Sequence, residues 1–461
     1  MISVATAKKG RMAVDMTTGS PTKALIMFAL PMIFSNIFQQ FYNIVDMLVV
    51  GNQIGSNALA AISTSSPISS LFIFAAMGLT TGAGVVISQY FGAKQLTNVK
   101  TSINTMLVFA AIAGLVLTVV GILLSPIVLR WINTPEEIMA DAVTYLRIYF
   151  AGALFLFMYN TLNSSYNALG NSRTPLYFLI LSSLLNVVLD LWFVMGLHMG
   201  VGGAALATTI AQGVSAVLSF INMRRRLRET ETDGPVKLFD KGIFKTIMRI
   251  AIPNALQQSI ISLGMVFIQS SINSFGAAVM AGVSAAGRVD SLSTMPLSNV
   301  GNAFGSYAGQ NIGAGRIDRV KQGLKSAVLF SIVAGGVMCV ILQIFAPQII
   351  SMFCDSADPN FAEMLDIGVR YVRVISVFAP VFGIFMVMMS MLRGAGDMKS
   401  FLTANFTNFL FRVLMALFVA PIFGPHIIWW ATAVGWSLAV IISVAFYRKG
   451  DWQKKSVIKK A

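Results

Sequence analysis

Long apolar stretches follow one another along this chain and leave few folds open to it. A helix that crosses the hydrocarbon core of a bilayer needs about 20 mostly apolar residues. Twelve stretches of this kind can be recognised, with expected limits 24–50, 58–88, 102–124, 138–162, 174–195, 200–222, 245–272, 280–308, 322–345, 362–390, 400–420 and 427–447. The sequence therefore predicts an all-α integral membrane protein with twelve transmembrane helices.

The composition supports this prediction and excludes other classes of protein. Of the 461 residues, 56% are hydrophobic and 11% are charged, whereas soluble domains carry about 25% charged residues. A soluble enzyme, a nucleic-acid-binding module and a disordered regulator are therefore excluded. Two cysteines and two histidines offer neither a disulfide framework nor a Cys/His metal cluster.

The positions of the charges predict the orientation in the membrane. Cytoplasmic loops of membrane proteins carry an excess of Lys and Arg. With a cytoplasmic N-terminus, most of the 33 basic residues fall on the inside, with dense groups at 224–249 and 448–460. The two longer outside loops carry acidic residues instead, namely Glu136, Glu137, Asp141, Asp355, Asp358, Glu363 and Asp366. We expect a multi-pass protein of the plasma (inner) membrane, with both termini cytoplasmic and its basic residues near anionic lipid rather than nucleic acid.

The chain also contains an internal duplication. Residues 55–100 align without gaps with residues 276–321 at a constant offset of 221, and both segments carry a Gln-x-x-Gly-Ala motif before Val-Lys. A five-residue insertion in the second acidic loop then shifts the offset to 226, which pairs Tyr145 with Tyr371. Each half has six spans, so both halves begin on the same side of the membrane. Transporters built from such parallel repeats commonly bind substrate between them.

The duplication sets the expected domain limits. They are 1–22 for a cytoplasmic N-terminal tail, 23–222 for an N-terminal lobe, 223–244 for a cytoplasmic linker, 245–447 for a C-terminal lobe and 448–461 for a basic cytoplasmic tail.

This pattern resembles the multidrug and toxic compound extrusion (MATE) family over nearly the whole chain, roughly from Lys23 to Arg448. The residues that carry the resemblance are the paired Gln-x-x-Gly-Ala motifs and two prolines, Pro31 and Pro253, in the first span of each half. The resemblance implies two pseudo-symmetric six-helix lobes and transport by alternating access between them.

Within the family, the chain is most similar to the DinF-like branch. Its first span carries Asp46, and its fifth carries Asn186-x-x-x-Asp190. It departs from the NorM-like branch, which uses acidic residues on the seventh and tenth helices, because residues 255–271 and 374–391 contain no carboxylate. The resemblance to the NorM-like branch therefore does not extend to ion coupling through the second lobe.

Four polar residues lie at similar depth in the outer half of the first lobe. Asp46 and Asp190 are about five residues, or about 7 Å, from the outer ends of their spans, and Asn186 and Thr208 lie at comparable levels. Two close carboxylates in a low dielectric do not both ionise cheaply and titrate as a unit, and such oxygens also suit Na⁺. The resemblance implies that Asp46, Asn186, Asp190 and Thr208 bind the coupling ion, H⁺ or Na⁺. The alternative is a set of helix-packing hydrogen bonds.

Pro31 interrupts the hydrogen bonding of the first span. The resemblance makes this residue a hinge whose bending is coupled to protonation of the aspartate, and a static kink is the alternative.

The second lobe contains three charges within its spans: Arg288, Asp290 and Arg412. Charged residues inside a membrane are costly, and they usually pair or serve a function. Arg288 and Asp290 are about 200° apart on a helix, so the pattern favours Arg412 as the partner of Asp290. We expect a buried pair that fixes the lobe, with substrate contact or ion coupling as alternatives.

These features predict a secondary antiporter, not an enzyme, that exports organic and often cationic or amphipathic small molecules in exchange for H⁺ or Na⁺. We expect a monomer with no cofactor beyond the coupling ion. A flippase for lipid-linked or amphipathic substrates of the same superfamily is the alternative. An integral-membrane enzyme is disfavoured because no reactive polar motif lies at a membrane face, and no Walker loop is present. The substrate and the choice of coupling ion stay open.

Overall fold

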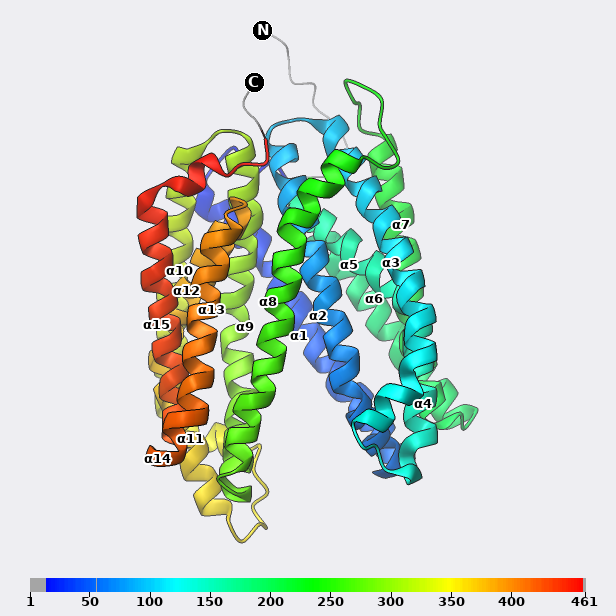
Figure 1. Ribbon diagram of the computed structural model, residues 1–461, viewed down its shortest axis with the longest axis vertical. Helices are drawn as coiled ribbons and strands as arrows, with labels where there is room; N and C mark the ends of the chain where they lie inside the picture. Colours follow the sequence, from blue (N-terminus) through cyan, green and yellow to red (C-terminus); the bar gives the residue numbers. More distant parts are fainter. Residues whose placement is uncertain (1–13, 55, 459–461) are drawn as a thin grey trace. The chain divides into compact units, whose positions relative to one another are not determined.

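The computed structural model describes residues 14–54 and 56–458, except for the side chains of residues 45–54, 56, 57, 59 and 75. These residues form helices joined by short turns (Figure 1). The helices of the first half are α1 (Pro21–Ile54), α2 (Ser56–Gly92), α3 (Leu96–Trp131), α4 (Glu136–Ala151), α5 (Ala153–Ala168), α6 (Arg173–Asp190), the π-helical segment η1 (Leu191–Gly196) and α7 (Gly200–Arg228).

The second half repeats this order. Its helices are α8 (Lys241–Asn273), α9 (Ala277–Gly313), α10 (Ile317–Ser351), α11 (Phe361–Val377), α12 (Ala379–Gly394), α13 (Met398–Leu414), the π-helical segment η2 (Met415–Val419), α14 (Ala420–Phe423), α15 (His426–Lys449) and a short 3-10 turn, η3 (Asp451–Lys454).

The twelve expected spans all coincide with helices or with bent helix pairs. Within the described residues, nine helices are long and apolar enough to cross a membrane, and the bent pairs α4–α5 and α11–α12 raise this number to eleven. The remaining span is α9, whose 37 residues are long enough to cross but include charged and small polar side chains. The prediction of an all-α membrane fold is confirmed.

The chain divides into two compact units. The first comprises Leu30–Ala255 and the residues up to Met16, and the second comprises Thr17–Ala29 and the residues from Leu256 onward. Two of the boundaries, at Leu30 and at Ala255, fall inside helices α1 and α8, and each lies within two residues of a proline, Pro31 or Pro253. This division by packing does not test the lobe limits expected from the sequence, which stay a prediction.

The same irregularities recur in both halves at the offset of 226 residues. The bend between α4 and α5 is 47° and lies at Gly152, and the bend between α11 and α12 is 54° and lies at Phe378. Gly170 and Gly396 both have positive φ, 76° and 79°, and each precedes the helix that ends in a π-helical segment. The offset found in the sequence therefore identifies structurally equivalent positions.

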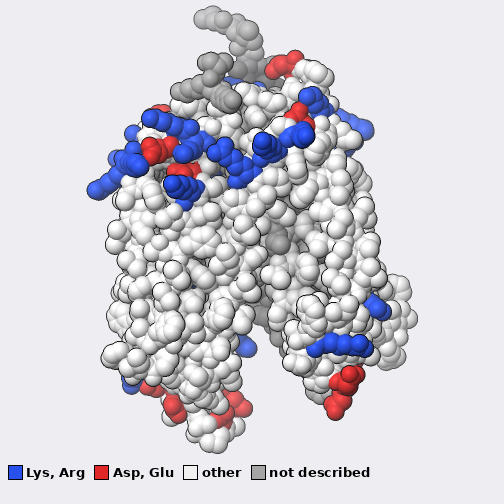
Figure 2. Space-filling model, in the orientation of Figure 1, with Lys and Arg blue, Asp and Glu red and all other residues white. Residues whose placement is uncertain are grey.

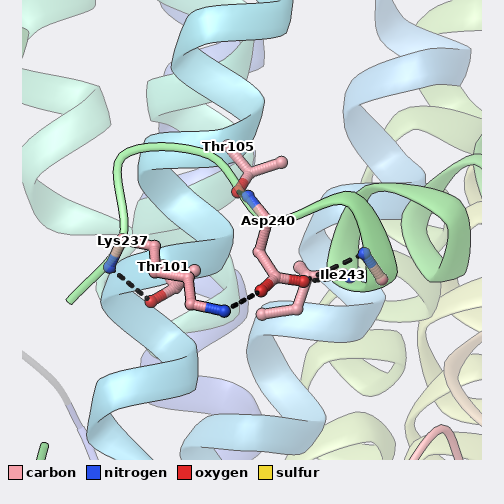
Figure 3. A network of polar contacts seen from close by, with 6 residues as sticks. Thr101, Thr105, Lys237, Asp240 and Ile243 are labelled. Atoms are coloured by element: carbon pink, nitrogen blue, oxygen red, sulfur yellow. Dashed lines mark hydrogen bonds and ion pairs between the residues drawn. The ribbon is translucent and has the colours of Figure 1, made fainter. Parts of the chain in front are cut away.

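The end of the linker is fixed to α3 within the first unit (Figure 3). The backbone N–H of Lys237 donates to the hydroxyl of Thr101 at 3.4 Å, and that of Asp240 donates to Thr105 at 3.1 Å. The Asp240 carboxylate caps α8, accepting from the backbone N–H of Ile243 at 3.0 Å, and it pairs with Lys237 at 2.9 Å. Residues 237–240 are therefore held against α3 by two threonine hydroxyls and joined to the first turn of α8 by the Asp240 carboxylate.

These contacts favour the ionised form of the Asp240 carboxyl group. The hydrogen bond from Lys237, assisted by the backbone N–H of Ile243, lowers the pKa of Asp240 below its usual value. This pKa is lower in the folded than in the unfolded protein, so the ionised carboxylate stabilises the fold. The stabilisation is complete when the pH is above the pKa of Asp240 in the unfolded protein, and it is lost as the pH falls through the pKa in the folded protein.

We expect Asp240→Ala to destabilise the protein by about 0.5–2 kcal/mol, the usual effect of removing a helix N-cap. The apparent melting temperature of the detergent-purified protein measures this loss at neutral pH. Asp240→Asn is the matched control, because it keeps the capping oxygen and should lose much less. Equal losses in the two variants would show that the cap is not the source of the effect.

Candidate functional site

The first unit contains a buried polar cluster centred on Asn186. Asn186 and Asp190 are four residues apart on α6 and therefore share one face of this helix, and both are buried, with 2% and 0% of their surfaces exposed. With its amide nitrogen toward the acceptors, Asn186 donates to Oδ2 of Asp190 at 2.8 Å and to the hydroxyl of Tyr42 at 3.0 Å. The sequence prediction that Asn186 and Asp190 act together is thus matched by a direct contact.

Thr208 completes this cluster from α7, which packs against α6. The carboxamide oxygen of Asn186 lies 3.3 Å from Oγ1 of Thr208 and accepts from its backbone N–H at 2.9 Å. A buried polar group needs such partners, because its desolvation is otherwise uncompensated. Asn186 therefore joins side chains of three helices, α1, α6 and α7.

Tyr42 was not among the residues singled out in the sequence. The missed signal is its spacing, because Tyr42 precedes Asp46 by four residues, as Asn186 precedes Asp190. The side chain of Asp46 lies outside the described residues, so its place in the cluster stays a prediction. The described members supply one carboxylate, one carboxamide and two hydroxyls, which are oxygen ligands suited to a hard cation.

Pro31 lies ten residues into α1, and its carbonyl accepts a hydrogen bond from the hydroxyl of Ser35 at 2.8 Å. The carbonyl that loses its backbone donor at Pro31 is that of Met27, one turn earlier. The proposed role of Pro31 as a hinge stays a prediction.

The charges of the second unit are arranged differently from the expectation. Arg288 is exposed, whereas Asp290 and Arg412 are partly buried, because the two α9 residues point to different sides of their helix. No ion pair within 4.0 Å joins Asp290 to an arginine among the described residues, although Asp290 and Arg412 lie within electrostatic range of each other. The expectation that Arg288 is buried is therefore wrong, and the pairing of Asp290 with Arg412 stays a prediction.

Tyr42→Phe tests whether the hydroxyl of Tyr42 supports the cluster. A hydrogen bond contributes about 0.5–1.5 kcal/mol net, so we expect a roughly 2- to 10-fold weaker apparent affinity for the coupling ion, with transport retained at high ion concentration. Tyr177→Phe on α6 is the control, because Tyr177 is 65% exposed and should be unaffected. An unchanged ion dependence in Tyr42→Phe would remove Tyr42 from the site.

Comparisons with known proteins agree with this fold. The sequence profile of the MatE family matches residues 31–192 and, a second time, residues 253–418. The chain is 32% identical over 444 residues to the probable multidrug resistance protein YpnP of Bacillus subtilis, across 96% of this chain and 98% of that protein. It is 26% identical over 448 residues to DNA damage-inducible protein F of Escherichia coli, across 94% of each.

The fold is also shared with solved structures. A MOP superfamily transporter from Pyrococcus furiosus superimposes with a TM-score of 0.87 at 24% sequence identity, over 98% of this chain and 100% of that chain. A MATE protein solved in complex with MaL6 gives a TM-score of 0.88 at 23% identity, over 97% of this chain and 100% of that chain. The double match to the family profile agrees with the internal duplication, and this chain belongs to the multidrug and toxic compound extrusion (MATE) family of membrane transporters.

Proposed function

We propose that this protein is a secondary antiporter that exports organic, often cationic or amphipathic, compounds in exchange for H⁺ or Na⁺ by alternating access. The names of its relatives support the export of varied compounds: YpnP is a probable multidrug resistance protein, and MepA of Staphylococcus aureus, 25% identical over 232 residues, is a multidrug export protein.

The observation that carries the proposal is the buried contact of Asp190 with Asn186. A carboxylate inside a membrane protein is costly when ionised, so such residues usually line ion pathways. Binding of H⁺ or Na⁺ neutralises the carboxylate, and loss of the ion restores a charge that favours a cationic substrate. The neutral partners Asn186, Tyr42 and Thr208 supply hydrogen bonds without a competing positive charge.

Asp46 is the proposed second carboxylate of this site. Position 46 follows Tyr42 by one turn on the same face of α1, and the hydroxyl of Tyr42 contacts Asn186. Two carboxylates at one site would titrate as a coupled pair, which would let a single proton or sodium ion control the charge of the whole cluster.

The proposed orientation places both termini in the cytoplasm and the basic residues at the anionic lipid surface of the inner membrane. Figure 2 shows Lys and Arg concentrated, within each unit, at the end that carries the linker or the C-terminal segment. Basic residues of this kind attract anionic headgroups. We propose that the protein works there as a monomer.

Reconstitution tests the exchange. The purified protein is incorporated into liposomes, and export of a fluorescent organic cation is followed while a proton gradient or a sodium gradient is imposed separately at zero membrane potential. We expect one gradient to drive uphill transport and its collapse by an ionophore to stop it. Transport at a rate that depends on neither gradient would refute antiport. Transport of a lipid-linked substrate in place of the organic cation would favour the alternative function of a flippase.

A further inference from the structure

The second half of the chain carries an arginine at the position where the first half carries Asn186. The offset of 226 residues pairs Asn186 with Arg412. Asn186 lies near the end of α6, which continues into the π-helical segment η1, and Arg412 lies near the end of α13, which continues into η2. The two halves therefore place a carboxamide and a guanidinium at equivalent points.

The neighbouring helix is equivalent as well. Asn186 contacts Thr208 on α7, and Arg412 packs beside Gly435 on α15, the helix equivalent to α7. A Cβ atom on Gly435 would lie 3.1 Å from Cγ of Arg412, so the glycine leaves the space that the arginine side chain fills. The offset pairs Gly435 with Thr209, the residue next to Thr208.

The carboxylate of the second half comes from a different helix. The offset pairs Asp190 with Ala416, so α13 and its π-helical segment supply no acid. Asp290 of α9 and Tyr371 of α11 lie near Arg412 instead. Val289, next to Asp290, belongs to the buried cluster against which Tyr371 packs, and the ring of Tyr371 lies 5.6 Å from that of Trp429 on α15, the helix that Arg412 meets at Gly435. Within the described residues, three buried polar atoms of this region have no hydrogen-bond partner: Oδ1 of Asp290, Oδ1 of Asn408 and Nε of Arg412.

We infer that the second half holds a cation site whose cation is the Arg412 side chain itself. The guanidinium of Arg412 is covalently part of the chain, and it takes the place that an exchangeable H⁺ or Na⁺ takes in the first half. Asp290 is its counter-charge. This inference rests on the ion site proposed for the first half. Arginine does not lose its proton in proteins and cannot diffuse away, so the second half does not exchange an ion.

Removal of the tethered charge should then open the site to a free cation. In Arg412→Asn, the carboxylate of Asp290 loses its counter-charge, and we expect the unpartnered oxygens of Asp290 and Asn408 to bind the entering cation together with the new carboxamide. Hard monovalent cations bind such oxygen ligands, and a buried carboxylate without a counter-charge favours binding strongly. Arg412→Lys keeps a tethered cation and is the matched control.

Binding of radioactive sodium to the purified protein at alkaline pH tests the inference. In the Asp190→Asn background, where the first site is disabled, we expect binding at background. Adding Arg412→Asn should restore saturable binding, adding Asp290→Asn should abolish it again, and Arg412→Lys should not restore it. Acidic pH should displace the restored sodium, because protons compete for the same carboxylate. Binding that stays at background in the folded Asp190→Asn/Arg412→Asn protein overturns the inference.

If the double variant does not fold, a single variant tests whether the second half binds the exchangeable ion. Asp290→Asn in the otherwise unchanged protein should leave the amount of sodium bound per folded protein unchanged, and loss of sodium binding by the folded variant would show that the second half binds the exchangeable ion. The result for the first half is independent. If the unchanged protein binds sodium above background and Asp190→Asn binds it equally well, the ion site proposed for the first half fails, while a gain of Asp290-dependent binding in Arg412→Asn would still support the tethered cation.

Discussion

Replacing Asp190 by Asn is expected to reduce ion-driven export to the level of protein-free liposomes. The substitution keeps the volume of the side chain and its contact with Asn186, but it removes the charge that H⁺ or Na⁺ neutralises in the proposed mechanism. With residue 190 neutral, the carboxylate pair proposed for this cluster is reduced to Asp46, and binding of the ion no longer changes the charge that contacts Asn186. The expected effect is therefore on coupling and not on folding.

The measurement is accumulation of a fluorescent cation in proteoliposomes, normalised to the amount of folded protein. Asp366→Asn is the control, because Asp366 is an exposed acid paired with Arg370 one turn away, and such surface pairs contribute little. Asp46→Asn should behave like Asp190→Asn. Near-normal uphill export by both variants would remove the proposed ion site.

Replacing Gly335 by Ala is expected to have a large effect on stability. Gly335 of α10 lies against the bend between α11 and α12, where a Cβ atom would be 2.6 Å from the backbone nitrogen of Pro380 and 2.8 Å from its Cα. Backbone atoms cannot rotate away, so the two helices must separate. Overpacking of this kind costs typically about 1–3 kcal/mol.

The adjacent residue offers a matched control in the same helix. A Cβ atom on Gly336 would meet nothing within 4 Å, so Gly336→Ala should be neutral or stabilising, by up to about 1 kcal/mol from helix propensity. Gly335→Ala should therefore lower the apparent melting temperature, whereas Gly336→Ala should leave it unchanged or raise it. Equal shifts would show that close helix packing at Gly335 does not limit stability.

The same packing should recur in the first half. Gly114 is the equivalent of Gly335 at the offset of 221, and its Cβ would lie 2.6 Å from the backbone Cα of Leu154, just after the bend between α4 and α5. Glycine at this point of the third helix in each half lets the bent pair approach closely, as small residues do between helices in membranes.

The sequence by itself determined the features that depend on local composition and spacing. A bilayer requires about 20 apolar residues per helix, so hydropathy located all twelve spans, and the fixed offsets revealed the duplication. The four-residue spacing of Asn186 and Asp190 determined that they share a helix face, because helical periodicity is a property of the segment alone.

Only the tertiary structure decided how the helix faces meet. It brought Tyr42 of α1 against Asn186 and left Arg288 exposed. It also fixed the linker to α3 through Lys237. These contacts depend on the rotation of each helix about its axis and on its distance from its neighbours, which follow from packing between segments far apart in the chain and not from the periodicity of any one of them.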